Sequence, residues 1–375
     1  MIMPTQFTQR TARGRQHWLR SVGAVAAASA LVLTGCSGSG TSETPSPSPA
    51  LTSAGPLTTG PSSAPASGDS ATAAPRERSG VTSVARTFPV NRHPVAVAVD
   101  PAGQMLLVAS RFDNVVSLFD LAGGELIADV PVGGSPAGLV VSPDGTKAYV
   151  ANSGDGSVSV LDLNTHQVVQ TITVGTRPLR LALSPDATVL YVTNSIDGTL
   201  SIVDTATGAD LGVVTVGQRP AGVSVDPANG NIWVVSRSDA TVSVIDPATY
   251  GISAVLAVGS DAVDVAIDGT ARRAYVANAG DASISVIDLD ALTVVSTVPL
   301  TGGPSAVAVD ELAQVGYVLA LNTVRVVDTG TGEVVRTIEL GEGPSGMTLQ
   351  PASGSVFVIG ADSSGQGWAA ELTAG

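Results

Sequence analysis

The chain has 375 residues, of which 44% are hydrophobic and only 3% aromatic, and its formal net charge is −14. Its 42 glycines and 23 prolines follow no collagen period, which favours a turn-rich fold with a large core. An acidic surface repels phosphate backbones, so nucleic acid is not an expected partner, and the single cysteine cannot form an intramolecular disulfide or a metal site alone.

The first 35 residues have the pattern of an export signal. Four arginines within positions 10–20 precede an apolar run at 21–33, which is too short for a membrane-spanning helix of about 20 residues. The sequence LTGC at 33–36 resembles the bacterial lipobox, with a leucine at −3 and a cysteine at +1. That resemblance implies lipidation of the Cys36 thiol and cleavage before it. The alternative is an ordinary secretory signal with a chance cysteine.

Residues 36–80 consist almost entirely of Ser, Thr, Pro, Ala and Gly, which cannot form a core. We expect them to be a disordered tether that spans roughly 35–40 Å as a coil. If residues 1–35 are the signal peptide, we expect Cys36 to anchor the mature protein to the extracytoplasmic face of a cell membrane. The expected source is a bacterium of the high-GC Gram-positive type. Two or more acyl chains hold a protein on a bilayer stably.

Residues 81–375 are predicted to form one repeat domain. A tetrapeptide typified by YVTN at 191–194 recurs at 107, 149, 191, 233, 275, 317 and 357, with 42 residues between copies except the last pair. A single position, which we call the marker, recurs with the same spacing: Pro94, Pro136, Pro178, Pro220, Ala262, Pro304 and Pro344. Seven units of this length, each read as four short alternating strands separated by Gly, Pro, Asn and Asp turns, predict an all-β, seven-bladed β-propeller of antiparallel blades.

The phase of the repeat predicts how the ring closes. The segment at 84–94 matches the fourth strand of a blade although it comes first in the domain, and the last unit ends without a fourth strand. We therefore expect residues near 84–90 to complete the last blade beside residues 367–372, which removes the exposed edges of an open ring.

The repeated letters resemble those of the YVTN-repeat seven-bladed propellers of secreted microbial proteins. The resemblance rests on YVTN at 191–194, the D-G-[ST]-[LV]-[ST]-[IV]-[IV]-D continuation and the V-G-x-x-P entry, and it covers residues 81–375. It implies the fold but not one activity, because related propellers include lactonases, quinone-dependent and haem d1 redox domains and a lyase.

Comparison of the seven repeats separates residues that recur in nearly every blade, which serve the fold, from residues that occur in one blade and can serve a ligand. Aspartates that recur in the turns of nearly every blade are expected to accept backbone hydrogen bonds. The residue before each marker instead varies, and it should ring the mouth of the central channel: His93, Ser135, Arg177, Arg219, Asp261, Gly303 and Gly343. Two residues after the marker the letter is small in five blades, but Arg180 and Asp264 break that rule, and a salt bridge across the channel is the expected reason.

Loops on the same face add Arg111 and Arg237, so the channel mouth is the candidate site. Its members are His93, Arg111, Arg177, Arg180, Arg219, Arg237, Asp261 and Asp264. Arginine forks suit carboxylate or phosphate groups, which predicts an anionic small molecule, glycan or peptide ligand. The alternative is that these arginines pair with nearby aspartates.

Three classes of function stay open. A membrane-anchored binding or interaction platform, for an envelope protein or an anionic ligand, is favoured over a lactonase- or lyase-like enzyme that uses His93 with Asp261 or Asp264. No Ser-His-Asp or H-E-x-x-H pattern occurs, so no catalytic residues, metal site or cofactor are assigned. The domain is expected to be a monomer.

Overall fold

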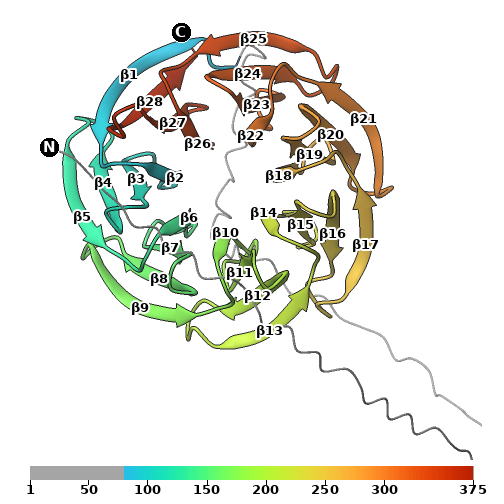
Figure 1. Cartoon of the computed structure of the whole chain (residues 1–375), viewed down its shortest axis with the longest axis horizontal. Helices are drawn as coiled ribbons and strands as arrows, with labels where there is room; N and C mark the ends of the chain where they lie inside the picture. Colours follow the sequence, from blue (N-terminus) through green and yellow to red (C-terminus); the bar gives the residue numbers. More distant parts are fainter. Residues whose placement is uncertain (1–79, 375) are drawn as a thin grey trace, which may run out of the picture. The chain divides into compact units, whose positions relative to one another are not determined.

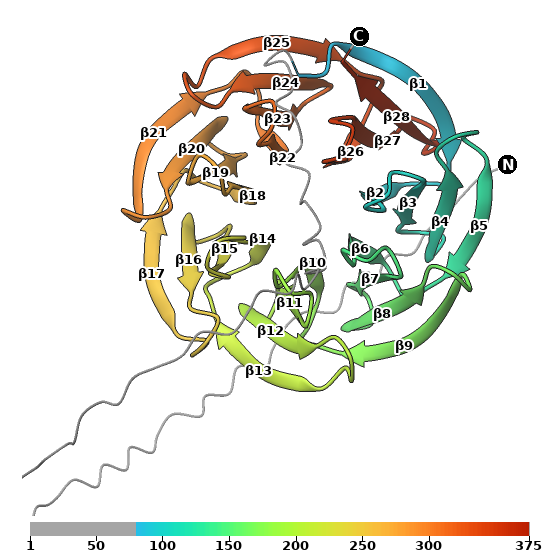
Figure 2. The same ribbon diagram turned by 180° about the vertical axis from the view of Figure 1, so that it is seen from behind.

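Short runs rich in Val and Ile form 28 strands within residues 80–374, which are the residues that the computed structural model describes. The strands make seven four-stranded sheets arranged as a ring, with the first strand of each sheet at the centre and the fourth at the perimeter (Figures 1 and 2). The seven-bladed β-propeller is thus confirmed. The predicted signal peptide, Cys36 and the tether up to residue 79 lie outside the described residues.

The blades follow the repeat in chain order. Blade 1 contains β2 (Pro94–Val99), β3 (Met105–Ser110), β4 (Val115–Asp120) and β5 (Leu126–Pro131). Blade 2 contains β6 (Pro136–Val141), β7 (Lys147–Asn152), β8 (Ser157–Asp162) and β9 (Gln167–Thr173). Blade 3 contains β10 (Pro178–Leu183), β11 (Val189–Asn194), β12 (Thr199–Asp204) and β13 (Asp210–Thr215). Blade 4 contains β14 (Pro220–Val225), β15 (Ile232–Ser236), β16 (Thr241–Ile245) and β17 (Ile252–Ala257).

The remaining three blades complete the ring. Blade 5 contains β18 (Ala262–Asp268), β19 (Arg273–Asn278), β20 (Ser283–Asp288) and β21 (Thr293–Pro299). Blade 6 contains β22 (Pro304–Asp310), β23 (Val315–Ala320), β24 (Thr323–Asp328) and β25 (Val334–Glu339). Blade 7 contains β26 (Pro344–Leu349), β27 (Val356–Ala361), β28 (Gly367–Thr373) and β1 (Ser83–Val90). Within residues 80–374 no helix is long and apolar enough to cross a bilayer.

Blade 7 is closed by the two ends of the domain, as the repeat phase predicted. Strand β1 pairs antiparallel with β28 from Ser83 opposite Thr373 to Val90 opposite Gly367, with a register shift between Val84 and Arg86. Arg86 also forms an ion pair with Glu371 at 2.6 Å. The fourth strand of the last blade therefore comes from the N-terminal side of the propeller.

The core lies between neighbouring blades. The first letter of each repeated tetrapeptide is a large side chain that packs in one hydrophobic cluster with a residue of the next blade: Tyr149 with Leu190, Tyr191 with Ile232, Trp233 with Ala274, and Tyr317 with Val356. In three of these pairs an aromatic side chain meets Leu, Ile or Val of the next blade. In the fourth pair the largest side chain, Trp233, meets the small Ala274. These four blade boundaries are thus filled by pairs of side chains that meet across them.

The small residues two positions after the marker are explained by contact between innermost strands. A Cβ at Gly138 in β6 would lie 2.2 Å from the carbonyl oxygen of Leu179 in the next blade, and one at Gly222 would lie 2.7 Å from the Cα of Asp264. Backbone cannot yield to such contacts, so side chains at this position must be small or must extend along the neighbouring strand.

Candidate functional site

The candidate site lies on the face of the propeller where the innermost strands begin. We call it the entry face; it is formed by the loops that join the fourth strand of one blade to the first strand of the next, together with the turns between the second and third strands. The residue before the marker has a positive φ in six of the seven blades: His93, Ser135, Arg177, Arg219, Asp261 and Gly343.

A left-handed backbone is unfavourable for residues with a side chain, and such positions often occur at ligand-binding sites. Here local hydrogen bonds fix the conformation, because the carbonyl of each of these residues accepts an N–H from a residue at the end of the second strand or just after it, as in Arg111 to His93 and Arg237 to Arg219. The loops of the entry face are therefore rigidly tied to the blades below them.

The turn aspartates serve the scaffold, as predicted. Five of them lie between the second and third strands and accept a backbone N–H from the residue two before the marker: Asp113, Asp155, Asp197, Asp239 and Asp281. Those that end third strands accept N–H groups of the following turn, as Asp204 does from Ala206 and Thr207. The Thr207 hydroxyl also donates to Asp204 at 2.6 Å, and this hydrogen bond, followed by those of the backbone, lowers the pKa of the Asp204 carboxyl, so it stays ionised in the folded protein.

A cavity of about 420 Å³ lies on the propeller axis and opens at the entry face. Its wall includes the residue just after the marker in every blade: Val95, Ala137, Leu179, Ala221, Val263, Ser305 and Ser345. Three arginines line the same cavity: Arg111, Arg180 and Arg237. The structure therefore brings three of the predicted arginines together on the axis.

Arg111 is the least satisfied of the three arginines. Its Nε is buried and has no hydrogen-bond partner, and no ion pair of its guanidinium occurs among residues 80–374. A buried donor on a charged group is costly to leave unpaired. This side chain is therefore ready to donate to an anion in the cavity.

Arg237 is paired within the protein, which is the outcome that the alternative interpretation predicted for this residue. Its Nε and one terminal nitrogen donate to the two carboxylate oxygens of Asp261 at 2.8 and 2.9 Å. The pair lowers the pKa of Asp261, with a smaller contribution from the charge of Arg219. Arg237 still lines the cavity, but its positive charge there is largely compensated.

The predicted salt bridge between Arg180 and Asp264 is wrong. Arg180 donates to the carbonyl oxygen of Ala137 in blade 2 at 2.8 Å, whereas Asp264 accepts the N–H of Val307 in blade 6 at 3.1 Å. The two side chains extend in opposite directions around the ring, because each lies along its own neighbouring innermost strand. They interact only through the longer-range field: burial raises the pKa of Asp264, and the charge of Arg180 opposes that rise.

The other predicted site residues lie outside the axial cavity. Arg177 and Arg219 are both exposed and line a separate groove of about 600 Å³ on the entry face, together with the exposed Ile196. His93 packs against Phe112 with ring centroids 4.5 Å apart, and no hydrogen bond joins it to Asp261 or Asp264 in the described part of the chain. The described residues therefore do not form the histidine–acid pair that the lactonase or lyase hypothesis requires.

The positions just after the marker, which form the cavity wall, were not predicted from the sequence. The predicted site residues stand before the marker, two residues after it, or in loops of the same face. The register shift between the marker and the next paired residue, as between Pro136 and Gly138, turns the intervening side chain toward the axis.

In the described residues no group of three or more His, Cys, Asp or Glu side chains could hold a metal ion.

Comparison with known proteins agrees with the fold described above. The arrangement of 28 strands defines a seven-bladed β-propeller, and a model of the YNCE-like beta-propeller family matches residues 93–186 and 251–353, more than half of the chain. The chain belongs to the YNCE-like beta-propeller family. No curated protein matches it.

Among solved structures, the chain is similar to one of hydrazine synthase from Kuenenia stuttgartiensis, with a TM-score of 0.65 and 20% identity. The match covers 72% of this chain and 94% of that chain. At this identity the likeness concerns the fold alone.

Proposed function

We propose that the propeller is a binding module that takes an anionic group, a carboxylate or a phosphate ester, into the axial cavity through its entry face. The observation that carries the proposal is Arg111, whose buried Nε has no partner while its side chain lines a cavity shared with Arg180 and Arg237. A guanidinium fork matches both classes of anion, since it can donate two parallel hydrogen bonds.

The charge distribution supports a selective site of this kind. The protein has a formal net charge of −14, so an anion is repelled over most of its surface. The walls of the cavity are mainly small apolar residues, which reduce screening around the guanidinium groups. The groove with Arg177 and Arg219 lies on the same face and offers further contacts to a ligand with an extended body, such as a peptide or a glycan.

Sulfate is a suitable probe because its charge is constant at neutral pH. We expect sulfate to bind the full-length protein at low ionic strength, and Arg111→Gln to weaken that binding roughly tenfold or more, since hydrogen bonds to charged groups contribute about 1.5–3 kcal/mol. Isothermal titration calorimetry measures the effect. Arg92→Gln is the matched control, because Arg92 is exposed on the same face, does not line the cavity and carries the same charge.

Two readouts of this titration distinguish a site from a general effect of charge. Equal loss of affinity in both variants contradicts the proposal. Sulfate binding is also expected to weaken as the pH rises from 3.8 through the raised pKa of Asp264, because the carboxylate then gains a negative charge near the cavity. Asp264→Asn should reduce this pH dependence, and an unchanged profile in that variant would mean that the carboxylate plays no part.

We further propose that the module is monomeric and is held on the extracytoplasmic face of a bacterial membrane through lipidated Cys36. The support is the lipobox-like LTGC at 33–36 after a short apolar run. Expressed in a bacterial host, the protein is expected to enter the detergent phase on Triton X-114 partitioning, and Cys36→Ser to shift it to the aqueous phase. Aqueous partitioning of the parent protein would contradict lipidation.

A further inference from the structure

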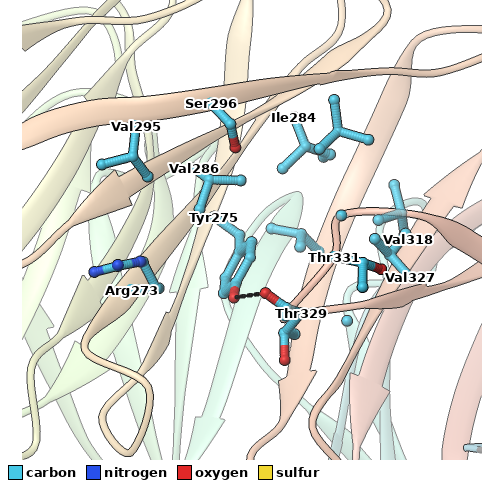
Figure 3. A pocket seen from close by; sticks show the side chains of 15 residues that line it. Arg273, Tyr275, Ile284, Val286, Val295, Ser296, Val318, Val327, Thr329 and Thr331 are labelled. Carbon is cyan, nitrogen blue, oxygen red and sulfur yellow. Dashed lines mark hydrogen bonds between the residues drawn. The ribbon is translucent and has the colours of Figure 1, made fainter.

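A second cavity, of about 210 Å³, lies between blades 5 and 6, away from the axis (Figure 3). Its inner wall is formed by buried apolar side chains of both blades: Ile284, Val286, Val307, Val318 and Val327, together with the ring of Tyr275. Its outer rim is formed by exposed residues: Val295 and Ser296 of β21, and Gly330 and Thr331 of the turn between β24 and β25. The cavity is thus deep, apolar and reachable from solvent.

A glycine creates the floor of this cavity. Gly316 in β23 stands where the other blades have a side chain: Leu106, Ala148, Leu190, Ile232, Ala274 and Val356. Each of the two nearest atoms to a Cβ added at Gly316 is 3.9 Å away, and φ there is not positive, so the backbone does not require a glycine. Tyr275 therefore faces an unfilled volume where Tyr149 faces Leu190 and Tyr191 faces Ile232.

The rim of the cavity also lacks side chains that cover the corresponding position at two other blade boundaries. Between blades 2 and 3, Gln170 reaches over and donates to the carbonyl oxygen of Thr207 at 2.8 Å. The residue equivalent to Gln170 in β21 is the shorter Ser296, since both pair with the same position of the third strand. At the boundary of blades 3 and 4, Tyr250 of the turn between the third and fourth strands packs on the hydrophobic cluster. The equivalent turn residue at the boundary of blades 5 and 6 is Gly332, which has no side chain to cover the cavity.

The wall residues are more exposed than their equivalents in other blades, as expected for residues that border a cavity. Val286 is 8% exposed, whereas the equivalent Ile202 and Val244 are 0% exposed. Val327 is 7% exposed, whereas the equivalent Ile287 is 0% exposed. Side chains that line an empty space lose van der Waals contacts, and a bound ligand that fills the space restores them.

We propose that this cavity, named the Gly316 cavity, is a binding site for a neutral, compact apolar molecule of the size of one substituted aromatic ring. An engineered cavity of about 150 Å³ lined by Leu, Ile and Phe stays dry and binds benzene, so 210 Å³ is sufficient for a ring with one or two substituents. The one charged wall residue, Arg273, pairs with Asp288 at 2.5 Å, which leaves no net charge to favour an ionic ligand.

The Tyr275 hydroxyl gives the site one polar contact. It donates to the carbonyl oxygen of Thr329 over a long 3.4 Å, and its own lone pairs are available to a ligand donor (Figure 3). Burial raises the pKa of this hydroxyl to about 12, so it is neutral at any ordinary pH. A phenol-like ligand can place its ring against the valines and donate its hydroxyl to Tyr275.

Toluene and 4-methylphenol are the probes that test this proposal on the full-length protein. Both are expected to bind and to raise the melting temperature with concentration, and 4-methylbenzoate is not expected to displace toluene, because its charge has no partner in this cavity. Gly316→Val, which installs the side chain of Val356, is expected to raise the dissociation constants of both neutral probes at least tenfold while raising the melting temperature of the free protein. Tyr275→Phe should weaken 4-methylphenol several-fold and leave toluene unchanged.

Rim variants provide a test that does not depend on repacking the core. Ser296→Gln places a longer side chain on the exposed rim, as Gln170 does in blade 2, and should weaken both neutral probes at least threefold. Gln170→Ser is the matched control and should leave them unchanged, since Leu190 fills the floor there. Unchanged binding in Gly316→Val and Ser296→Gln, or no binding by the parent protein up to the solubility of the probes, would overturn the proposal. Sulfate binding should be the same in all these variants, which separates this site from the axial cavity.

Discussion

Deletion of residues 80–90 is expected to lower the melting temperature by more than about 10 °C. The deletion removes β1, which completes blade 7, and with it the buried side chains of Val81, Phe88 and Val90. Burial of each such side chain contributes about 1.5–3 kcal/mol, so the loss is about 5 kcal/mol or more. It also exposes the edge of β28 to pairing with other chains. Differential scanning calorimetry measures the first effect and light scattering the second.

Point variants within β1 serve as the control for this deletion. Phe88 is buried against Phe119 of blade 1, with ring centroids 5.5 Å apart, whereas its neighbour Thr87 is exposed. Phe88→Ala should reproduce a large part of the loss, and Thr87→Ala should change stability very little. A synthetic peptide with the sequence of residues 80–90 should restore part of the melting temperature of the deletion variant. A deletion variant as stable as the parent would contradict closure of the ring by β1.

Gly138→Ala is expected to destabilise the protein by about 3 kcal/mol, the upper end of the cost of overpacking. The added Cβ would lie 2.2 Å from the carbonyl oxygen of Leu179, so blades 2 and 3 must move apart along their innermost strands. Because the moving atom is backbone, a change of rotamer cannot relieve the contact. Urea denaturation monitored by tryptophan fluorescence reports the change in free energy of unfolding.

The internal repeat supplies a matched control for this variant. Gly346 occupies the same position in blade 7, but a Cβ there meets first the side chain of Ile359 at 3.3 Å and only then the carbonyl oxygen of Val95 at 3.5 Å. Gly346→Ala should therefore be nearly neutral, with a small gain from the reduced freedom of the unfolded chain. Similar losses in both variants would mean that the spacing between innermost strands is uniform and that Gly138 is not specially confined.

The sequence predicted the architecture because the features that specify a blade are local and repeated. Alternating Val and Ile letters, a turn aspartate such as Asp197 and a marker such as Pro178 lie within one 42-residue unit, so each copy confirms the next. Even the closure of the ring followed from the phase of the repeat. These features depend on backbone hydrogen bonding and periodicity, which a sequence displays directly.

The details of the candidate site were harder to predict because they depend on side-chain direction between units. Arg180 and Asp264 have opposite charges and equivalent positions, which suggested a salt bridge, but each lies along a different neighbouring strand. Likewise, Arg237 and Asp261 are paired across a blade boundary that no local pattern shows. Gly316 could have been noticed, since it is the one glycine in its column of the repeat.

The pairing of β1 with β28 also sets the order of events when the chain is made. Strand β1 is the first strand of the propeller to leave the ribosome, yet its partner β28 is the last of the described strands and ends at Thr373. The ring consequently cannot close until β28 has also been made. Before that point the blades form an open row, and only the arrival of β28 allows them to become a closed ring.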